Sequence, residues 1–245
     1  MKTRLILLII PFYGILFSSC EKYKCIEGTG RVSVSERDLL STPFTGIISK
    51  GDFDIYLYED TVTPYFVTIE TDENIRPYIV TEVTGNDLII ETINDKCLQT
   101  DFPIRINVYL PYIEYIAMEG DGNIFCDYIY SDLLIVDLPG SGFIQLYGLD
   151  AGMVEASITG SGKLELGGFA YDTRFLNSGS GQLVSDLLRS NNCTINISGS
   201  GDMFVWAMDL ITGKMSGSGN LYYKVWPYKG INVELSGTGD IFPLY

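Results

Sequence analysis

The chain has 245 residues, with 16 Lys or Arg against 31 Asp or Glu, so its formal net charge is −15 at pH 7. This acidic balance argues against nucleic acid and anionic membrane surfaces as partners, because phosphate groups bind to clustered cations. The sequence contains no histidine, which excludes histidine-based catalytic triads and the usual zinc sites. We therefore expect no metal and no other cofactor.

Residues 1–19 have the pattern of a secretion signal. Basic residues come first, an apolar run from Leu5 to Phe17 follows, and small residues end the segment. Cys20 comes directly after them, as in a bacterial lipoprotein signal, in which this cysteine becomes the lipidated first residue. An ordinary cleaved signal, with Cys20 incidental, is the alternative. Since no later apolar run reaches the ~18 residues of a membrane span, we expect export and a lipid anchor in the outer membrane, facing the periplasm or the cell surface.

Residues 20–35 are expected to form the lipidated N-terminus and a strand that leads into the fold. Residues 36–118 are rich in strand patterns but lack a regular repeat. Within them, Gly51-Asp52-Phe53 resembles a degraded glycine corner, and Ile79–Ile93 predicts a hairpin that turns at Gly85-Asn86-Asp87. We interpret this part as irregular coils and hairpins that cap a more regular stack, because the terminal units of a stack must close its open edge.

Residues 119–245 form a regular repeat. A Gly-x-Gly motif recurs seven times at intervals of 18 to 20 residues. Its first glycines are Gly120, Gly140, Gly160, Gly179, Gly199, Gly217 and Gly237. A fixed period in this range is typical of a solenoid, in which each unit stacks on the next.

Apolar and polar residues alternate on both sides of the motif. Around the third motif, for example, Ala156, Ile158 and Leu164 alternate with polar residues. This alternation predicts strands with one buried face, so each unit consists of two short strands that meet at a glycine corner. We predict an all-β fold, a right-handed parallel β-helix (β-solenoid) with coils of about 20 residues. The handedness follows from the usual chirality of crossovers between parallel strands.

Glycine is expected at the corners for two reasons. A sharp turn between strands usually needs a positive φ, which glycine adopts without penalty. Stacked coils also lie about 4.8 Å apart, so a bulky side chain at a corner would collide with the next corner. A calcium-binding repeat with a shorter period is the alternative source of regular glycine turns. Directly after the motif only Asp202 and Asp240 are acidic, and Lys163 stands there in another copy, so no calcium ladder is expected.

The chain has five cysteines. Cys20 is assigned to the lipid anchor, whereas Cys126 and Cys193 fall in columns of inward-facing apolar residues and are expected to be buried. Cys25 and Cys97 lie outside the regular repeat and are the candidates for a disulfide that fastens the N-terminal part. A catalytic thiol is not expected, because the sequence offers no histidine to activate it.

Several motifs of the first half occur in a fixed order ahead of the glycine repeat. They are Phe44-Thr45-Gly46-Ile47, Phe53-Asp54-Ile55, Tyr78-Ile79-Val80-Thr81-Glu82-Val83, Leu88-Ile89-Ile90 and Ile106-Asn107-Val108-Tyr109-Leu110-Pro111. With them, most of residues 28–243 resembles the putative auto-transporter adhesin family with the head GIN domain. The resemblance implies a β-helical exported module with an adhesive or carbohydrate-related role, and it transfers no catalytic residue to this sequence.

Aromatic residues at outward-facing positions of the last coils and in the loop that follows indicate a binding surface. The candidate ligand-binding residues are Phe204, Trp206, Tyr222, Trp226 and Tyr228, together with Asp202 and Asn220. Aromatic faces suit stacking on sugar rings, and the two polar side chains suit hydrogen bonding to hydroxyl groups. The alternative is that these aromatic residues are ordinary strand formers that pack against the loops.

We therefore expect a non-catalytic, envelope-anchored binding or adhesion module whose partner is a glycan or an envelope protein. A structural scaffold or spacer of the envelope, assembling with other copies edge to edge, is the first alternative. The second is a polysaccharide-acting enzyme, since β-helices host such enzymes. That chemistry needs paired carboxylates, or a base with a neutralising cation, in one cleft, and the sequence shows no such set.

Overall fold

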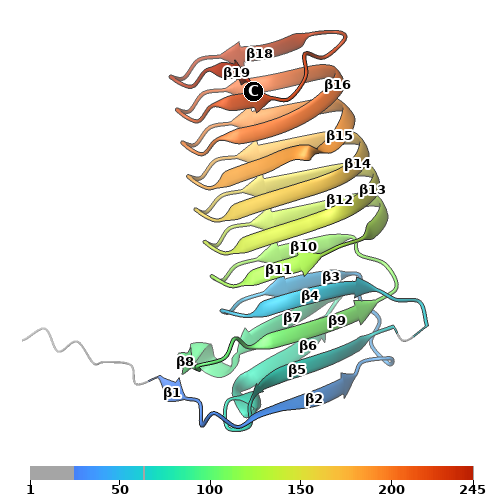
Figure 1. The fold of residues 1–245 in the computed structure, drawn as a ribbon, viewed down its shortest axis with the longest axis vertical. Helices are drawn as coiled ribbons and strands as arrows, with labels where there is room; N and C mark the ends of the chain where they lie inside the picture. Colours follow the sequence, from blue (N-terminus) through green and yellow to red (C-terminus); the bar gives the residue numbers. More distant parts are fainter. Residues whose placement is uncertain (1–24, 63, 245) are drawn as a thin grey trace, which may run out of the picture.

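The alternating pattern around each glycine corner produces a tall stack of parallel β-coils (Figure 1). This computed structural model describes residues 25–62 and 64–244. The predicted signal and the predicted lipid at Cys20 therefore lie outside the described residues. In the described residues, no helix has the length and apolar character that crossing a membrane would require.

Each regular coil contains two strand segments, one on either side of a glycine corner. The strands of these coils are β10 (Tyr115–Met118), β11 (Asn123–Cys126), β12 (Ile129–Leu138), β13 (Phe143–Ile158), β14 (Lys163–Asn177), β15 (Gln182–Ile197), β16 (Met203–Met215), β17 (Leu221–Tyr223), β18 (Ile231–Leu235) and β19 (Ile241–Pro243). The long strands bend midway, so the first part of β13 pairs with β11 and its second part pairs with β12, both in parallel. We call the segments that follow a corner the first wall and the segments that precede a corner the second wall. The predicted β-solenoid of parallel coils is confirmed.

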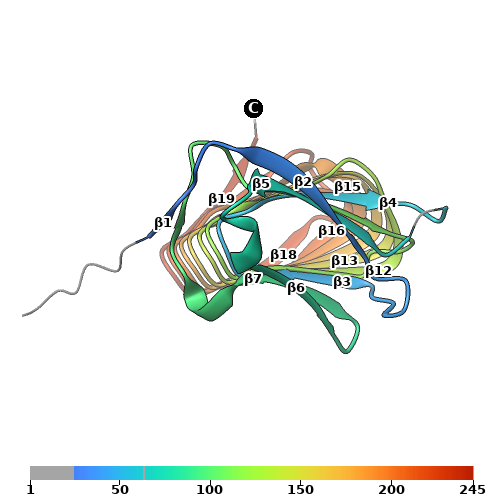
Figure 2. The ribbon, with the colours of Figure 1, turned by 90° about the horizontal axis from the view of Figure 1, so that it is seen from below.

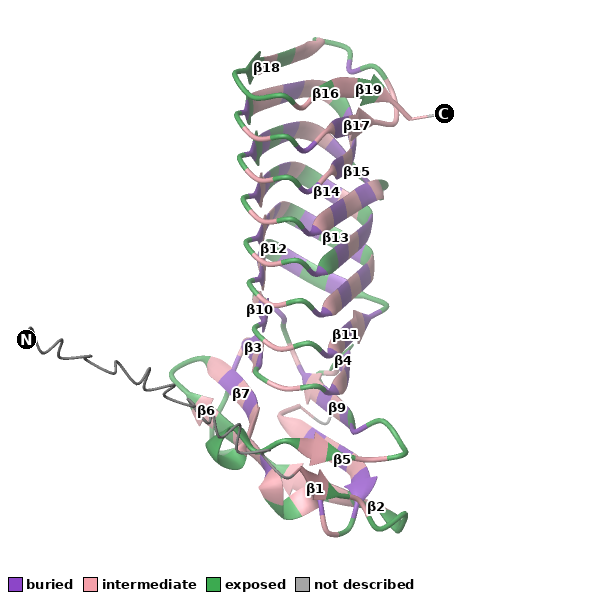
Figure 3. Cartoon of the chain, turned by 90° about the vertical axis from the view of Figure 1, so that its left-hand side faces the viewer, coloured by how far each residue is buried: buried purple, intermediate pink, exposed green. Residues whose placement is uncertain are grey.

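The register between coils places like residues in columns. In the second wall, Ile116 lies opposite Val136, and Val136 lies opposite Ala156. In the first wall, Ile124 lies opposite Ile144. These side chains are buried between the two walls, and buried residues alternate with more exposed ones along most of the long strands, such as β13 and β15 (Figure 3). Because removal of apolar surface from water is the main favourable term in folding, this continuous core holds the coils together.

The corner glycines are required by crowding between coils. A Cβ atom on Gly160 would collide with the backbone carbonyl oxygen of Gly140 in the preceding coil, and the same collision recurs at the other corners. None of the corner glycines has a positive φ, so the expectation of a positive φ at the corners is wrong. The turn is instead spread over the whole motif and held by bonds between coils, such as the one from Ser180 N–H to Gly160 O at 3.0 Å.

One further coil lies below the first regular one. β3 (Gly46–Ser49) pairs with β10, and β4 (Asp54–Glu59) pairs with β11, both in parallel. The backbone of Gly51 lies against Gly120, where a Cβ atom on Gly120 would collide with it. The predicted degraded corner is therefore a true member of the stack.

The lower end combines parallel and antiparallel strands. Its elements are β2 (Val32–Asp38), β5 (Phe66–Asp72), the 3-10 helix η1 (Arg76–Tyr78), β6 (Ile79–Thr84), β7 (Asp87–Thr92), the 3-10 helix η2 (Ile93–Asp95) and β9 (Arg105–Leu110). β7 and β9 still pair in parallel, with β3 and β4. β5 pairs antiparallel with β9 and β2, and β6 pairs antiparallel with β7. The β6–β7 hairpin turns at Gly85 and Asn86, as the sequence predicts. Seen from below, η1 lies over the end of the stack (Figure 2).

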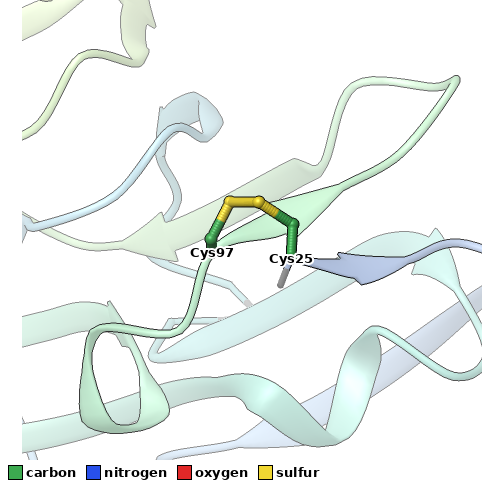
Figure 4. The surroundings of a disulfide bond; sticks show 2 residues. All are labelled: Cys25 and Cys97. Atoms are coloured by element: carbon green, nitrogen blue, oxygen red, sulfur yellow. A yellow bond between two sulfur atoms is a disulfide. The ribbon is translucent and has the colours of Figure 1, made fainter. Parts of the chain in front are cut away.

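A small separate sheet lies beside the lower end. β1 (Ile26–Glu27) pairs with β8 (Leu98–Gln99) in parallel. Cys25 and Cys97, the candidate pair, form a disulfide directly before these two strands (Figure 4). The bond joins the start of the described chain to a segment 72 residues further along the sequence.

Candidate functional site

The outer face of the first wall carries a column of side chains with one member from each successive strand. From the lower end upward, the column is Asn107, Tyr56, Phe125, Gln145, Glu165, Val184, Phe204, Tyr222 and Phe242. Aromatic residues gather toward both ends of this column, and none occupies its middle. The wall therefore offers two aromatic surfaces, separated by Gln145, Glu165 and Val184.

The upper aromatic surface is a stack of three rings, formed by Phe204, Tyr222 and Phe242, which we call the terminal ladder. The ring centroids of Phe204 and Tyr222 lie 4.6 Å apart with an angle of 8° between the ring planes. Those of Tyr222 and Phe242 lie 5.5 Å apart at 28°. Rings stacked in this way cover one another's faces. Of the predicted ligand-binding residues, Tyr222 is therefore covered on both ring faces and Phe204 on the face toward Tyr222, while Phe242 at the end of the ladder is 40% exposed.

The other three predicted aromatic residues do not form one flat platform. The Lys224 ammonium nitrogen lies 4.3 Å from the centroid of the Trp206 ring, so a cation–π contact occupies that face. Trp226 meets Tyr223 edge to face, with centroids 5.7 Å apart. Tyr228 lies in the loop after β17 and is 88% exposed. These side chains form separate groups around the upper end.

The two predicted polar residues are engaged in bonds between coils. The backbone N–H and the side-chain amide of Asn220 both donate to Asp202 Oδ1, at 2.7 and 3.2 Å. Asn220 Oδ1 in turn accepts the N–H of Asp240 at 3.1 Å. These bonds tie successive coils together at the point where each enters the first wall. Asp202 and Asn220 therefore already have partners within the stack.

The lower aromatic surface borders a groove. β4 continues to Glu59, whereas β11 above it ends at Cys126, so the outer end of β4 has no strand above it. The resulting groove has a volume of about 370 Å³. Its lining includes Tyr56, Tyr58, Glu59, Phe125, Tyr128 and Gln145. We call this surface the aromatic groove.

Tyr58 presents a free ring face to the aromatic groove. On one side it stacks on Tyr109, with centroids 4.9 Å apart and an angle of 15° between the planes. On its other side β11 has already ended at Cys126, so no ring of the next coil covers it. Tyr58 is accordingly 43% exposed. Beside it, Tyr56 stacks on Phe125 at 5.2 Å, which fixes the aromatic wall of the groove.

The aromatic groove also contains the carboxylate of Glu59. Glu59 Oε2 accepts the backbone N–H of Tyr130 at 3.1 Å. Glu59 Oε1 is buried within the protein, so this oxygen is not presented to a ligand in the groove. Burial raises the pKa of Glu59, and backbone hydrogen bonds from Tyr130 and Ile113 offset this only in part.

A polar network marks the upper border of the aromatic groove. Gln145 Nε2 donates to Glu165 Oε2 at 3.1 Å, and the Tyr147 hydroxyl donates to the same oxygen at 2.9 Å. Lys163 Nζ pairs with Glu165 Oε1 at 2.6 Å. This network holds Gln145 in place and separates the groove from the terminal ladder.

The two free cysteines are buried, as expected, and one of them lines the groove. Burial raises the pKa of Cys126 to about 12 and that of Cys193 to about 12. Since the thiolate is the nucleophilic form of cysteine, neither residue is an active nucleophile near neutral pH.

The aromatic groove was not predicted from the sequence. Its stacked pair, Tyr56 and Phe125, is separated by 69 positions in the chain and meets only through the register of β4 with β11. The one local signal is the alternation Tyr56-Leu57-Tyr58, which places both tyrosines on the same side of a strand. This alternation could have identified the aromatic face but not the missing strand that opens it.

Comparison with protein families gives one match. The family model described as "Putative auto-transporter adhesin, head GIN domain" matches residues 43–227. The range covers well over half of the 245 residues, and it confirms the resemblance predicted from the sequence. Among curated proteins, none matches the chain significantly.

Several solved structures share the fold. A putative adhesin from Bacteroides fragilis is 21% identical with a TM-score of 0.82, and the alignment covers 89% of this chain and 100% of that one. A putative lipid binding protein from Parabacteroides distasonis is 21% identical with a TM-score of 0.72, covering 91% and 100%. A putative adhesin from Parabacteroides merdae is 19% identical with a TM-score of 0.67, covering 90% and 99%. At such identities the likeness establishes a common fold and leaves the ligand open.

Proposed function

The chain belongs to the family described as "Putative auto-transporter adhesin, head GIN domain", and on that premise we propose that it is a non-catalytic binding module of the cell envelope. In this proposal the ligand contacts the aromatic groove of the first wall. The ligand class that suits the groove best is a neutral glycan.

The observation that carries the proposal is the free ring face of Tyr58 in the aromatic groove. A sugar ring has one flat face of C–H groups and an edge of hydroxyl groups. The first suits the tyrosine ring and the second suits polar lining residues such as Gln145 and Asp127. Small-molecule sites usually occupy roughly 300–1,000 Å³ and combine an apolar lining with a few polar groups. The groove, at about 370 Å³, is large enough for one or two sugar residues by this measure.

Charge favours a neutral ligand over an acidic one. The chain carries a formal net charge of −15, and Glu59 and Asp127 both line the aromatic groove. A negatively charged glycan would be repelled by this field. We therefore expect neutral sugars to bind and uronic or sialic acids to be disfavoured.

Two features argue against catalysis by histidine or cysteine, whereas the carboxylates of Glu59 and Asp127 in the groove are tested by the search for sugar products below. The sequence contains no histidine. Burial raises the pKa of each free cysteine to about 12, so a thiolate nucleophile is lacking near neutral pH.

The envelope location in this proposal rests on the N-terminal sequence and on one bond. Residues 1–19 have a signal pattern and Cys20 the position of a lipidated cysteine. The Cys25–Cys97 disulfide suits the oxidising conditions outside the cytoplasm, where such bonds persist. Metabolic labelling with a radioactive fatty acid tests the anchor, because the label should be lost in Cys20→Ser.

Binding of residues 21–245 to a panel of neutral and acidic glycans tests the proposed ligand class. This segment contains every strand that the structure describes. We expect saturable binding to a neutral glycan, and a weakening of about tenfold or more in Tyr58→Ala, since ring stacking contributes roughly 1–3 kcal/mol in comparable aromatic contacts. Tyr228→Ala is the matched control, because this tyrosine is exposed but lies far along the stack in the loop after β17.

Other outcomes would correct the proposal in specific ways. Loss of binding in Tyr228→Ala with wild-type binding in Tyr58→Ala would move the site to the upper end. Release of shortened sugar products would contradict the absence of catalysis. A chain that binds no glycan would exclude the carbohydrate ligand and leave an envelope protein as the partner.

A further inference from the structure

The upper end of the stack leaves its core uncovered. In the interior of the second wall, Val136 is 0% exposed, whereas Leu235 in β18 is 49% exposed. Ile231 and Val233, which continue the inward-facing columns, are only partly buried, and β18 has no buried residue (Figure 3). The opposite end has η1 and antiparallel strands over it, and Ile75 beside η1 is 0% exposed. The two ends of the same core therefore differ in how far they are covered.

β18 also presents an unpaired backbone edge. The N–H of Ser236 donates to Met215 O, and the carbonyl of Gly230 accepts the N–H of Ile211. Because successive residues of a strand point their backbone groups to opposite sides, the residues between these two that point outward are Ile231, Val233 and Leu235. Their N–H and C=O groups line the open edge.

We propose that this edge pairs with β18 of a second copy of the chain, in an antiparallel register centred on Val233. This inference is independent of the proposed glycan binding. In that register Val233 faces its own counterpart, and Ile231 faces Leu235 of the second copy. The outward-pointing groups of both strands would form about six main-chain hydrogen bonds. The partly exposed core residues of both copies would be buried against each other.

The register is self-complementary in its polar residues as well. It places Asn232 opposite Glu234 of the second copy on the outer face, twice per dimer by symmetry. An amide donor opposite a carboxylate is a favourable cross-strand pair. Residues 224–245 contain two lysines, Lys224 and Lys229, against one glutamate and one aspartate, so this segment has a formal charge of zero within a chain of −15. In the proposed dimer, two strongly acidic molecules therefore meet through a segment without net formal charge.

The same geometry limits assembly to two copies. An isologous contact uses one surface on both partners and closes after a dimer, whereas head-to-tail contacts produce rings or filaments. Head-to-tail growth would need the lower end, where η1 lies over the stack (Figure 2). In the first wall, Pro243 lacks an N–H group, which blunts the edge of β19. β18 is then the strand that carries the contact.

Substitutions at Asn232 test the register in solution. We expect residues 21–245 to form a concentration-dependent dimer in sedimentation equilibrium. Asn232→Asp places like charges opposite each other at two positions and should weaken dimerisation roughly tenfold. Asn232→Lys places opposite charges there and should dimerise at least as well as the wild type. Because residue 232 is exposed in the single chain, both variants should keep the wild-type melting temperature.

Cysteine cross-linking tests the symmetry centre. In the proposed register the Cα atoms of the two Val233 residues lie about 5.5 Å apart, within the range that a disulfide spans. Val233→Cys should give a covalent dimer on mild oxidation, whereas Asn232→Cys, which faces Glu234, should not. A wild-type chain that stays monomeric at about 100 µM, equal weakening by both Asn232 substitutions, or the growth of filaments would each overturn the proposal.

Discussion

The terminal ladder and the aromatic groove lie on the same face of the same wall, yet they present different surfaces. In the terminal ladder every coil adds a ring, and Tyr222 is stacked on both sides, by Phe204 and by Phe242. In the aromatic groove Tyr58 is stacked on one side only, by Tyr109. The difference arises because β11 ends before it can continue that column. A regular repeat directs its aromatic faces toward one another, and a free face appears where a coil departs from the repeat or where the stack ends, as at Phe242.

The largest difference in stability between the regular coils and the irregular part is expected for glycine substitutions. In the regular part, Gly160→Ala would drive a Cβ atom into backbone atoms of the preceding coil, so we expect a loss of roughly 3 kcal/mol or more in the free energy of unfolding. In the irregular part, Gly85 has a φ of 65° and open space around it. Gly85→Asn should therefore lose less than about 1 kcal/mol, since asparagine tolerates this conformation.

Urea denaturation of both variants is the measurement. Gly160→Asn should be as damaging as Gly160→Ala, because any Cβ atom collides at the corner. Equal losses of unfolding free energy at Gly160 and Gly85 would contradict the conclusion that steric crowding, and not a positive φ, requires glycine at the corners.

The disulfide should stabilise the irregular part and leave the regular coils unchanged. We expect Cys25→Ser with Cys97→Ser to lose about 2–4 kcal/mol of local stability. Hydrogen exchange should accelerate in β1 and β8, and in the lower strands that the closed loop contains. In β14 and β15 exchange should stay slow, since a solenoid unit contacts mainly its neighbours. Faster exchange throughout the chain would show that the stack folds as one unit.

The two aromatic surfaces should differ in how much a ring contributes to stability. Tyr222→Ala removes two stacked contacts, at 4.6 and 5.5 Å, and we expect a loss of about 2 kcal/mol. Tyr58→Ala removes one, and should lose about 1 kcal/mol or less. Tyr222→Phe keeps both contacts and should match the wild type in thermal unfolding. A larger loss at Tyr58 than at Tyr222 would reverse the comparison.

The smallest expected effect is the contribution of Glu59 to the pH dependence of folding stability. Burial raises the pKa of this group in the folded chain, so the folded state holds the proton more tightly than the unfolded state. The stabilising contribution of the protonated form is complete below the usual pKa of about 4.3 and is lost as the pH rises through the raised value. Glu59→Gln should therefore be slightly more stable than the wild type at pH 7, by less than about 1 kcal/mol after solvent screening.

The pH range of that difference is itself a check. Unfolding curves from pH 3 to pH 8 should show the advantage of Glu59→Gln shrinking to zero near pH 4. An advantage that persists at pH 3 would have to come from something other than the carboxylate charge.

Much of the fold could be predicted because its information is local and repeated. The glycine spacing gives the coil length, and the alternation around it gives the buried columns, such as Ile116 with Val136. The positive φ expected at the corner glycines is absent, since φ at a corner depends on how several residues share the turn. The crowding expected at the corners is present, because it depends only on the distance between coils.

The candidate site was harder to predict because it depends on where columns are interrupted. Trp206 was expected to offer a ring face, but Lys224 from the next coil occupies it. The register shifts between β15 and β16 near Arg189, so counting from the glycines does not give the neighbours there. Similarly, Tyr58 acquires its free face from the end of β11, which lies far away in the sequence.

The position of the disulfide determines how a pulling force would travel through this molecule. A load applied to the chain ahead of Cys25 passes through the sulfur–sulfur bond directly to Cys97. The strands of the enclosed loop, from β1 to β7, lie off this covalent path. Tension therefore bypasses β1, β6 and η1, and it enters the fold beyond residue 97, next to β9 and the wall that holds the aromatic groove. In mechanical terms the closed end of the stack is shielded from tension applied ahead of Cys25.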